Sequence, residues 1–173
     1  KIEKVIYEKN VKIEKFTEPK ECPVCQHGII AVGAKHYCSN RYCFGKRLAY
    51  INYFVSRDVM NINDISEATV KQLVYKGFVS SPEDLYKLTK YNILALEGFA
   101  EKSANKLLEN IEKSKQPTLE KFIVSLGILN VGINTAKALA RRFNNIKNLQ
   151  KATIDDLIVI DDNILEEFIL RKY

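Results

Sequence analysis

The four cysteines of this chain lie within 22 residues and form two close pairs. Two residues separate Cys22 from Cys25, four residues separate Cys38 from Cys43, and a 12-residue loop joins the two pairs. Two thiolates from each tight turn can complete a tetrahedral Zn²⁺ site. Disulfides are the alternative, but we expect an intracellular chain, in which thiols stay reduced. Because sulfur would fill all four positions, the metal would be structural, and we assign no catalytic residue.

Polar side chains surround the cysteines and leave two interpretations open. His27 and His36 are the only histidines, and either could replace a ligand. Four cysteines already fill the coordination shell, so surface positions are favoured for both. Basic residues flank the second pair and could contact phosphate or could simply be solvated: Lys35, Arg41, Lys46 and Arg47.

A second kind of chemistry is indicated around Gly98. The stretch Leu94–Ala104 reads as a helix end, a tight turn at Gly98 and the start of a new helix, which is a helix-hairpin-helix. Glycine allows the backbone to turn with φ > 0, and the following helix begins with unpaired N–H groups at its positive end. Such donors suit a phosphate oxygen. We therefore expect Gly98, Phe99 and Ala100 to contact phosphate, with Lys102 adding charge.

Weaker copies of this turn recur at a nearly constant interval. Taking the turn starts as Asp64, Gly98, Asn130 and Asp162, the intervals are 34, 32 and 32 residues. A fixed period of this size indicates supersecondary units that bury a core by stacking. The sequence thus predicts a mainly α fold, with four helix-hairpin-helix units after the cysteine cluster and a short β segment at residues 1–16.

The four turns differ in how well they suit a phosphate. The third turn contains Gly132 and leads into a helix with polar residues at its start, so its predicted DNA contacts are Val131, Gly132, Asn134, Thr135 and Lys137. The first and fourth turns lack glycine and carry aspartates. We interpret these two copies as packing units and do not expect them to bind phosphate.

Local signals mark where helices begin and end. We predict a helix over residues 46–57 and a strong helix start at Ser81, where Pro82 follows and Asp84 lies three residues on. Thr89 and Thr118 start further helices, and Thr153 with Asp156 forms a capping box. Two residues that tolerate left-handed backbone end helices: Gly77 and Asn144.

Composition excludes some classes of protein. The chain of 173 residues is 46% hydrophobic, which is enough for a core, yet no apolar run approaches the ~20 residues of a membrane span. Residues 89–151 carry 11 basic and 5 acidic side chains, out of a net charge of +6 for the whole chain. This excess fits a polyanion partner or a solvated lysine-rich face. Since the chain begins with Lys1 and its only methionine is Met60, we expect it to belong to something longer.

These observations by themselves predict a zinc-stabilised binder of duplex DNA. Two well-formed hairpins about one unit apart could hold backbone phosphates across a groove without reading bases. Affinity would then depend on salt and little on sequence.

Several motifs, in order, also resemble one protein family. They are the cysteine pairs, the segment Ser56–Ile62, the stretch Leu96–Phe99 and the stretch Ser125–Gly132. Together they resemble the C-terminal half of bacterial NAD-dependent DNA ligases. The resemblance implies that residues 1–16 are the last strands of an oligonucleotide-binding (OB) domain, 17–45 a four-cysteine zinc finger, and 46–173 a helix-hairpin-helix domain.

The resemblance also implies a function in DNA replication and repair. This region would hold nicked duplex DNA through backbone phosphates while absent N-terminal domains, using NAD and magnesium, seal the nick. The family's adenylated lysine, which precedes Asp-Gly by two residues, is missing here, so the segment should be inactive alone. We expect a monomer in the bacterial cytoplasm, associated with the nucleoid and not with membrane. The alternative is a freestanding, non-catalytic zinc and helix-hairpin-helix protein that binds DNA structures.

Overall fold

The computed structural model describes residues 18–33, 35–158 and 160. The strands predicted within residues 1–16 and the fourth hairpin turn at Asp162 lie outside the described residues. The chain divides into two compact units, one ending at Phe44 and the other beginning at Gly45.

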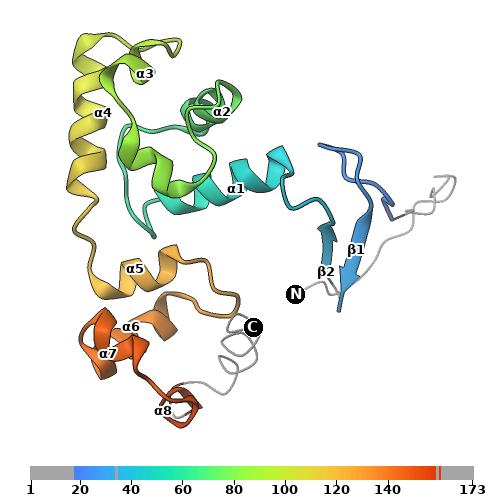
Figure 1. The fold of residues 1–173 in the computed structure, drawn as a ribbon, viewed down its shortest axis with the longest axis vertical. Coiled ribbons are helices and arrows are strands. Elements are labelled where there is room, and N and C mark those ends of the chain that lie inside the picture. Colours follow the sequence, from blue (N-terminus) through green and yellow to red (C-terminus); the bar gives the residue numbers. More distant parts are fainter. Residues whose placement is uncertain (1–17, 34, 159, 161–173) are drawn as a thin grey trace, which may run out of the picture. The chain divides into compact units, whose positions relative to one another are not determined.

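The first unit contains the four cysteines and a small antiparallel hairpin. Strand β1 (Ile29–Val32) pairs with β2 (Lys35–Cys38), with Ile29 opposite Cys38 (Figure 1). The sequence did not predict this hairpin, because both of its faces are largely exposed and no alternation of apolar residues marks it. Among the described residues of this unit, only Cys22 and Cys43 are buried. The described part of this unit therefore lacks a hydrophobic core of its own.

The second unit is helical throughout its described part (Figure 1). None of the described helices is long and apolar enough to cross a membrane. Its elements are α1 (Phe44–Val55, whose first residue closes the first unit), α2 (Glu67–Tyr75), the 3₁₀ turn η1 (Pro82–Lys87), α3 (Lys90–Leu94), α4 (Glu101–Lys113), α5 (Leu119–Ser125), α6 (Ile133–Phe143), α7 (Ile146–Gln150) and α8 (Ile154–Ile158).

Most of the described helices bury apolar side chains in the core of this unit, whereas α7 buries none. Helix α4, for example, buries Ala104, Leu107 and Ile111, which recur at the three- and four-residue spacing of one helical face. The Tyr53 hydroxyl of α1 donates a 3.0 Å hydrogen bond to the carbonyl of Val124, which connects α1 to α5. The largest fully buried apolar side chains of the unit are Ile51, Leu73, Leu85, Ile93, Leu107, Ile123 and Leu139.

The predicted helix starts at Thr89, Thr118 and Thr153 are confirmed, and the helix predicted over 46–57 spans Phe44–Val55. Thr89 caps α3 by accepting a hydrogen bond from the Asn92 amide, and Asp156 accepts one from the Thr153 amide at 3.0 Å. The helix end at Asn144 has φ 61°, in the left-handed range that asparagine tolerates. The proline at residue 82 starts a 3₁₀ turn rather than an α-helix.

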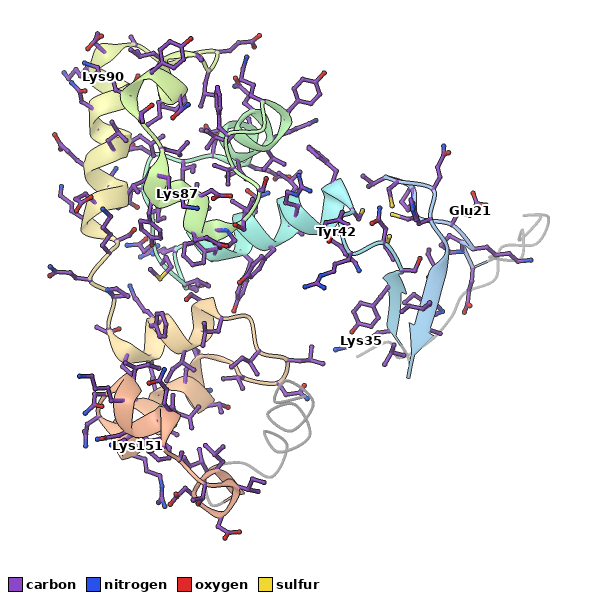
Figure 2. The ribbon with its side chains drawn as sticks, in the orientation of Figure 1. Glu21, Lys35, Tyr42, Lys87, Lys90 and Lys151 are labelled. Atoms are coloured by element: carbon purple, nitrogen blue, oxygen red, sulfur yellow. The ribbon has the colours of Figure 1, made fainter. Side chains whose placement is uncertain are left out.

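Asp84 is the polar residue that fixes the start of η1. Its Oδ2 accepts hydrogen bonds from the amides of Ser80 at 3.0 Å and Ser81 at 3.2 Å. Its Oδ1 accepts one at 2.8 Å from Lys87, which is labelled in Figure 2. Lys87, followed by the Ser80 amide, lowers the pKa of the Asp84 carboxyl to about 2.

We expect Asp84→Asn to lower the free energy of unfolding at pH 7 by about 1 kcal/mol, as for other lost caps. Since the folded pKa lies below the unfolded value of about 3.9, the carboxylate stabilises the fold above pH 4. Its contribution should disappear as the pH falls from 4 to 2. Urea unfolding followed by circular dichroism at both ends of this range checks the prediction, with Glu83→Gln as control. If the free energies of unfolding of wild type and Asp84→Asn differed as much at pH 2 as at pH 4, the prediction would be contradicted.

Candidate metal centre and nucleic-acid interface

The four cysteine sulfurs come together in the first unit. Their Sγ atoms all lie within 4.8 Å of one another, with Cys25 and Cys38 3.4 Å apart and Cys22 and Cys43 3.9 Å apart. The yellow sulfurs are visible near Tyr42 in Figure 2. A disulfide requires about 2.05 Å, so these cysteines are free thiols. Tetrahedral zinc with bonds of about 2.3 Å holds its sulfurs about 3.8 Å apart. The cluster therefore fits a metal ion such as zinc.

The tight turns of the cluster favour thiolates at two positions, whereas burial opposes a thiolate at a third. The backbone amide of His27 lowers the pKa of the Cys25 thiol to about 6, and those of Val24 and Cys25 lower the pKa of Cys22. Burial raises the pKa of Cys38 to about 12, and the neighbouring cysteines add to this. Four thiolates so close together require a cation to offset their repulsion. A bound metal would act here as a structural cross-link.

The two histidines lie beside the cluster but have other partners. The Nδ1 of His27 is 2.9 Å from the carbonyl of Cys25, and the Nε2 of His36 is 3.3 Å from a carboxylate oxygen of Glu18. Neither histidine belongs to the group of side chains placed to share a metal ion.

The three described hairpin turns share one backbone conformation. The first hairpin (Asp64–Ser66), the second (Gly98–Ala100) and the third (Asn130–Gly132) each begin with a residue of positive φ: 61°, 81° and 61°. Each ends with an extended residue that precedes a helix. Aspartate, glycine and asparagine are the residue types that best tolerate the left-handed region. The unequal sequences of the three turns thus produce the same bend.

The hairpins differ at the helix starts that follow them. In the first hairpin, the Ser66 hydroxyl accepts a 3.1 Å hydrogen bond from the Thr69 amide and caps α2. Ala100 and Gly132 hold the same position before α4 and α6 and have no side-chain oxygen, so neither caps its helix. The second and third hairpins therefore present helix N-termini that are not closed by an N-cap side chain, as anion binding requires.

Gly132 and Gly98 have different structural reasons for being glycine. Gly98 has φ +81°, which disfavours any side chain, whereas Gly132 has φ −86°, which any residue can adopt. A Cβ atom built on Gly132 would meet no atom within 4 Å. The turn can therefore fold without glycine at position 132. Because Gly132 has no side chain, there is space for a ligand outside the protein to approach its backbone closely.

Comparisons with known proteins agree with these motifs. A family described as "SAM-like Helix-hairpin-helix tandem" matches residues 56–113, and one described as "Helix-hairpin-helix motif" matches residues 121–163. Proteins named "DNA ligase" are similar over most of the chain. That of Clostridium perfringens (strain 13) is 43% identical over 150 residues, which is 86% of this chain. The resemblance to bacterial DNA ligases is confirmed.

This ligase-related chain spans less than a quarter of the relatives that it matches. It covers 23% of the Clostridium perfringens ligase. The ligase of Phytoplasma mali (strain AT) is 43% identical over 82% of this chain and 22% of its own length. That of Oceanobacillus iheyensis is 37% identical over 93% of this chain and 24% of its own length.

In the ligase-related chain, most predicted DNA contacts lie on the surface of two hairpins. Phe99 and Thr135 are half-buried. Val131 is only 4% exposed, and its amide donates a 3.1 Å hydrogen bond to the Ile128 carbonyl, so Val131 belongs to the core and is not placed to contact DNA. Thr135 already has an interaction within the chain. The remaining predicted contacts are exposed: Gly98, Ala100, Lys102, Gly132, Asn134 and Lys137.

Sequence reasoning missed the residues that join the first two hairpins. Lys106 of α4 forms an ion pair with Asp64 at 3.1 Å, and Asn110 donates a 2.7 Å hydrogen bond to the same carboxylate. Gln72 of α2 accepts a 2.8 Å hydrogen bond from the amide of Glu97, just before the second hairpin. Lys106, more than Asn110, lowers the pKa of Asp64. Asp64 thus neutralises a lysine and positions the second hairpin beside the first.

Proposed function

We propose that this chain is the part of an NAD-dependent DNA ligase that holds duplex DNA at a nick during replication and repair. The observation that carries the proposal is the identity of 37–43% to DNA ligases over a segment containing two helix starts that have no N-cap side-chain hydrogen bond. The longer protein would seal the nick with NAD and magnesium. Its place of action would be the bacterial cytoplasm, at the nucleoid.

Each open hairpin would bind one or two backbone phosphates. The amides at the starts of α4 and α6 would donate hydrogen bonds to phosphate oxygens, and the helix dipoles would add favourable charge. Lys102 and Lys137 are exposed near the starts of these helices and would contribute Coulomb attraction. Glu101 lies beside Lys102 but forms an ion pair with Lys90, which is labelled in Figure 2, and this reduces its repulsion of phosphate.

Zinc bound by Cys22, Cys25, Cys38 and Cys43 would have no chemical step in this function. It would fix two loops whose own side chains bury almost nothing. One zinc ion per monomer is therefore the expected content.

Gel-shift titrations of the zinc-loaded chain with nicked and intact duplexes test the proposal. We expect the logarithm of the binding constant to fall linearly with the logarithm of salt concentration, by about 0.9 for each phosphate contacted. A slope magnitude of at least about 2 follows from two hairpins. Affinities for nicked and intact DNA should be similar, because contacts with backbone phosphates do not distinguish nicked from intact DNA. Binding that ignores salt would contradict phosphate contact.

The same preparation tests whether this chain lacks the adenylation activity that the rest of the ligase would supply. Incubated with NAD labelled in its adenylate group, the chain should gain no covalent label, because the family's lysine motif is absent. The alternative, a freestanding DNA-binding protein, also predicts no label. It predicts in addition that the chain added to a ligase lacking this region leaves nick sealing unchanged, whereas our proposal predicts partial recovery.

A further inference from the structure

A polar cleft at the joint between α4 and α5 has no assigned function. It encloses about 280 Å³ and is formed by the loop before the first hairpin, the end of α4 and the beginning of α5. Ligand pockets for whole cofactors usually measure about 300–1,000 Å³ and are mostly apolar. This cleft is smaller, and six of its ten lining residues carry an amide or ammonium group: Asn61, Asn63, Asn110, Lys113, Gln116 and Lys121.

The charged side chains that line the cleft are positive. Among the residues that the structure describes, no aspartate or glutamate lines it. Within the described residues, neither Lys113 nor Lys121 forms an ion pair with a carboxylate. This contrasts with Lys106, two turns earlier on the same face of α4, whose charge is neutralised by Asp64 at 3.1 Å. Glu112, next to Lys113 in the sequence, is paired with Lys115 at 2.6 Å. Glu120, next to Lys121, forms no such pair within the described residues, although the pKa of its carboxyl is lowered, chiefly by its own backbone amide and in smaller part by attraction to Lys121.

We propose that this cleft binds an oxyanion of the phosphate class, with Lys113 and Lys121 supplying charge and Asn61 and Asn63 supplying amide donors. Ammonium and amide N–H groups are good hydrogen-bond donors to the oxygens of a tetrahedral oxyanion. Asn110 cannot act as a free donor, because its amide already binds the Asn63 carbonyl at 3.2 Å and Asp64. It instead holds the loop at the edge of the cleft.

The position of the cleft suggests where the oxyanion would come from. Residues of the first and second hairpins line another cleft, which also includes Ser103 of α4. Lys113, which lines the cleft described above, lies ten residues after Ser103 on the same helix. At 1.5 Å per residue, the two clefts are about 15 Å apart along α4. A strand of duplex DNA advances about 3.4 Å per phosphate, so a strand held at the second hairpin could place a phosphate here about four steps on. This source rests on the proposed function, and free phosphate is the other source.

The experiment compares two double variants of the full 173-residue chain. Lys113→Gln/Lys121→Gln removes both charges of the cleft. Lys115→Gln/Lys151→Gln removes two charges outside it and is the control; Lys151 is labelled in Figure 2. Inorganic phosphate is titrated into each protein while the side-chain amide signals of Asn61 and Asn63 are followed by NMR. Duplex DNA binding is measured in parallel as a function of salt.

If the cleft holds a DNA phosphate, its double variant should lower the salt slope by about 1–2, and the control should leave it unchanged. If the source is free phosphate, saturable shifts of the two amides should be lost in the cleft variant only, with the DNA slope unaltered. An unchanged slope together with no saturable shift in wild type would overturn the proposal. Should wild type fail to bind DNA at all, the proposed function fails, and the phosphate titration alone decides the cleft.

Discussion

Removal of the metal should unfold residues 18–44 and leave the helices of the second unit folded. The reason is that the first unit buries only Cys22 and Cys43 among its described residues. Two strands of four residues each cannot form a stable sheet alone. We therefore expect metal binding, which supplies about 10–16 kcal/mol in small zinc domains, to provide most of the free energy that folds residues 18–44.

Elemental analysis and amide hydrogen exchange check this prediction. The purified reduced chain should contain one zinc ion. After chelation, exchange protection should disappear at amides bonded within the unit, such as Cys22 to His27 at 2.8 Å and Ile29 to Lys20 at 2.9 Å. Protection of the Leu107 amide in α4 should persist.

Cys25→Ser supplies a second route to the same result, and His27→Ala is its control. The serine variant should lose zinc, whereas the alanine variant should keep it, because the His27 ring contacts a carbonyl instead of joining the four sulfurs. A metal-free chain that retained its protected β1–β2 amides, or a His27→Ala variant without zinc, would refute the four-cysteine assignment.

Valine at Gly98 and Gly132 together should weaken duplex binding by about a hundredfold or more. Loss of a hydrogen bond to a charged group is worth about 1.5–3 kcal/mol, or roughly tenfold to more than a hundredfold in affinity. Gly98→Val also strains the bend, since valine is disfavoured at φ +81°. The single variant Gly132→Val is therefore the sharper probe, because position 132 tolerates a side chain inside the fold.

Ser66→Ala is the matched control for Gly132→Val. Both residues precede a helix and have nearly the same φ, −87° and −86°. The alanine variant loses the cap of α2 and about 1 kcal/mol of stability, yet it should change DNA affinity less than twofold. Thermal unfolding of each variant separates folding from binding. Similar losses of affinity in Ser66→Ala and Gly132→Val would refute the ranking of the hairpins.

Much of the local structure could be predicted from residue types alone. Residues that tolerate positive φ mark the three described bends at intervals of 34 and 32 residues, and threonine and serine mark helix starts. These signals act within about four residues of the chain, so they survive without knowledge of the fold. The β1–β2 hairpin was missed because its residues have little apolar pattern and are ordered by the cysteine turns beside them.

The sequence by itself determined the kinds of site that this protein carries: a four-cysteine cluster, repeated bends before helices, and a basic middle region. Only the tertiary structure decided which of these face each other. It joined Asp64 to Lys106, joined Gln72 to the amide of Glu97, and placed Asn61 and Lys121 in the lining of one cleft. The physical reason is that such contacts depend on how helices pack. Helices pack to bury their apolar faces, and this hydrophobic driving force is non-directional. Local sequence patterns therefore do not predict which residues will be in contact.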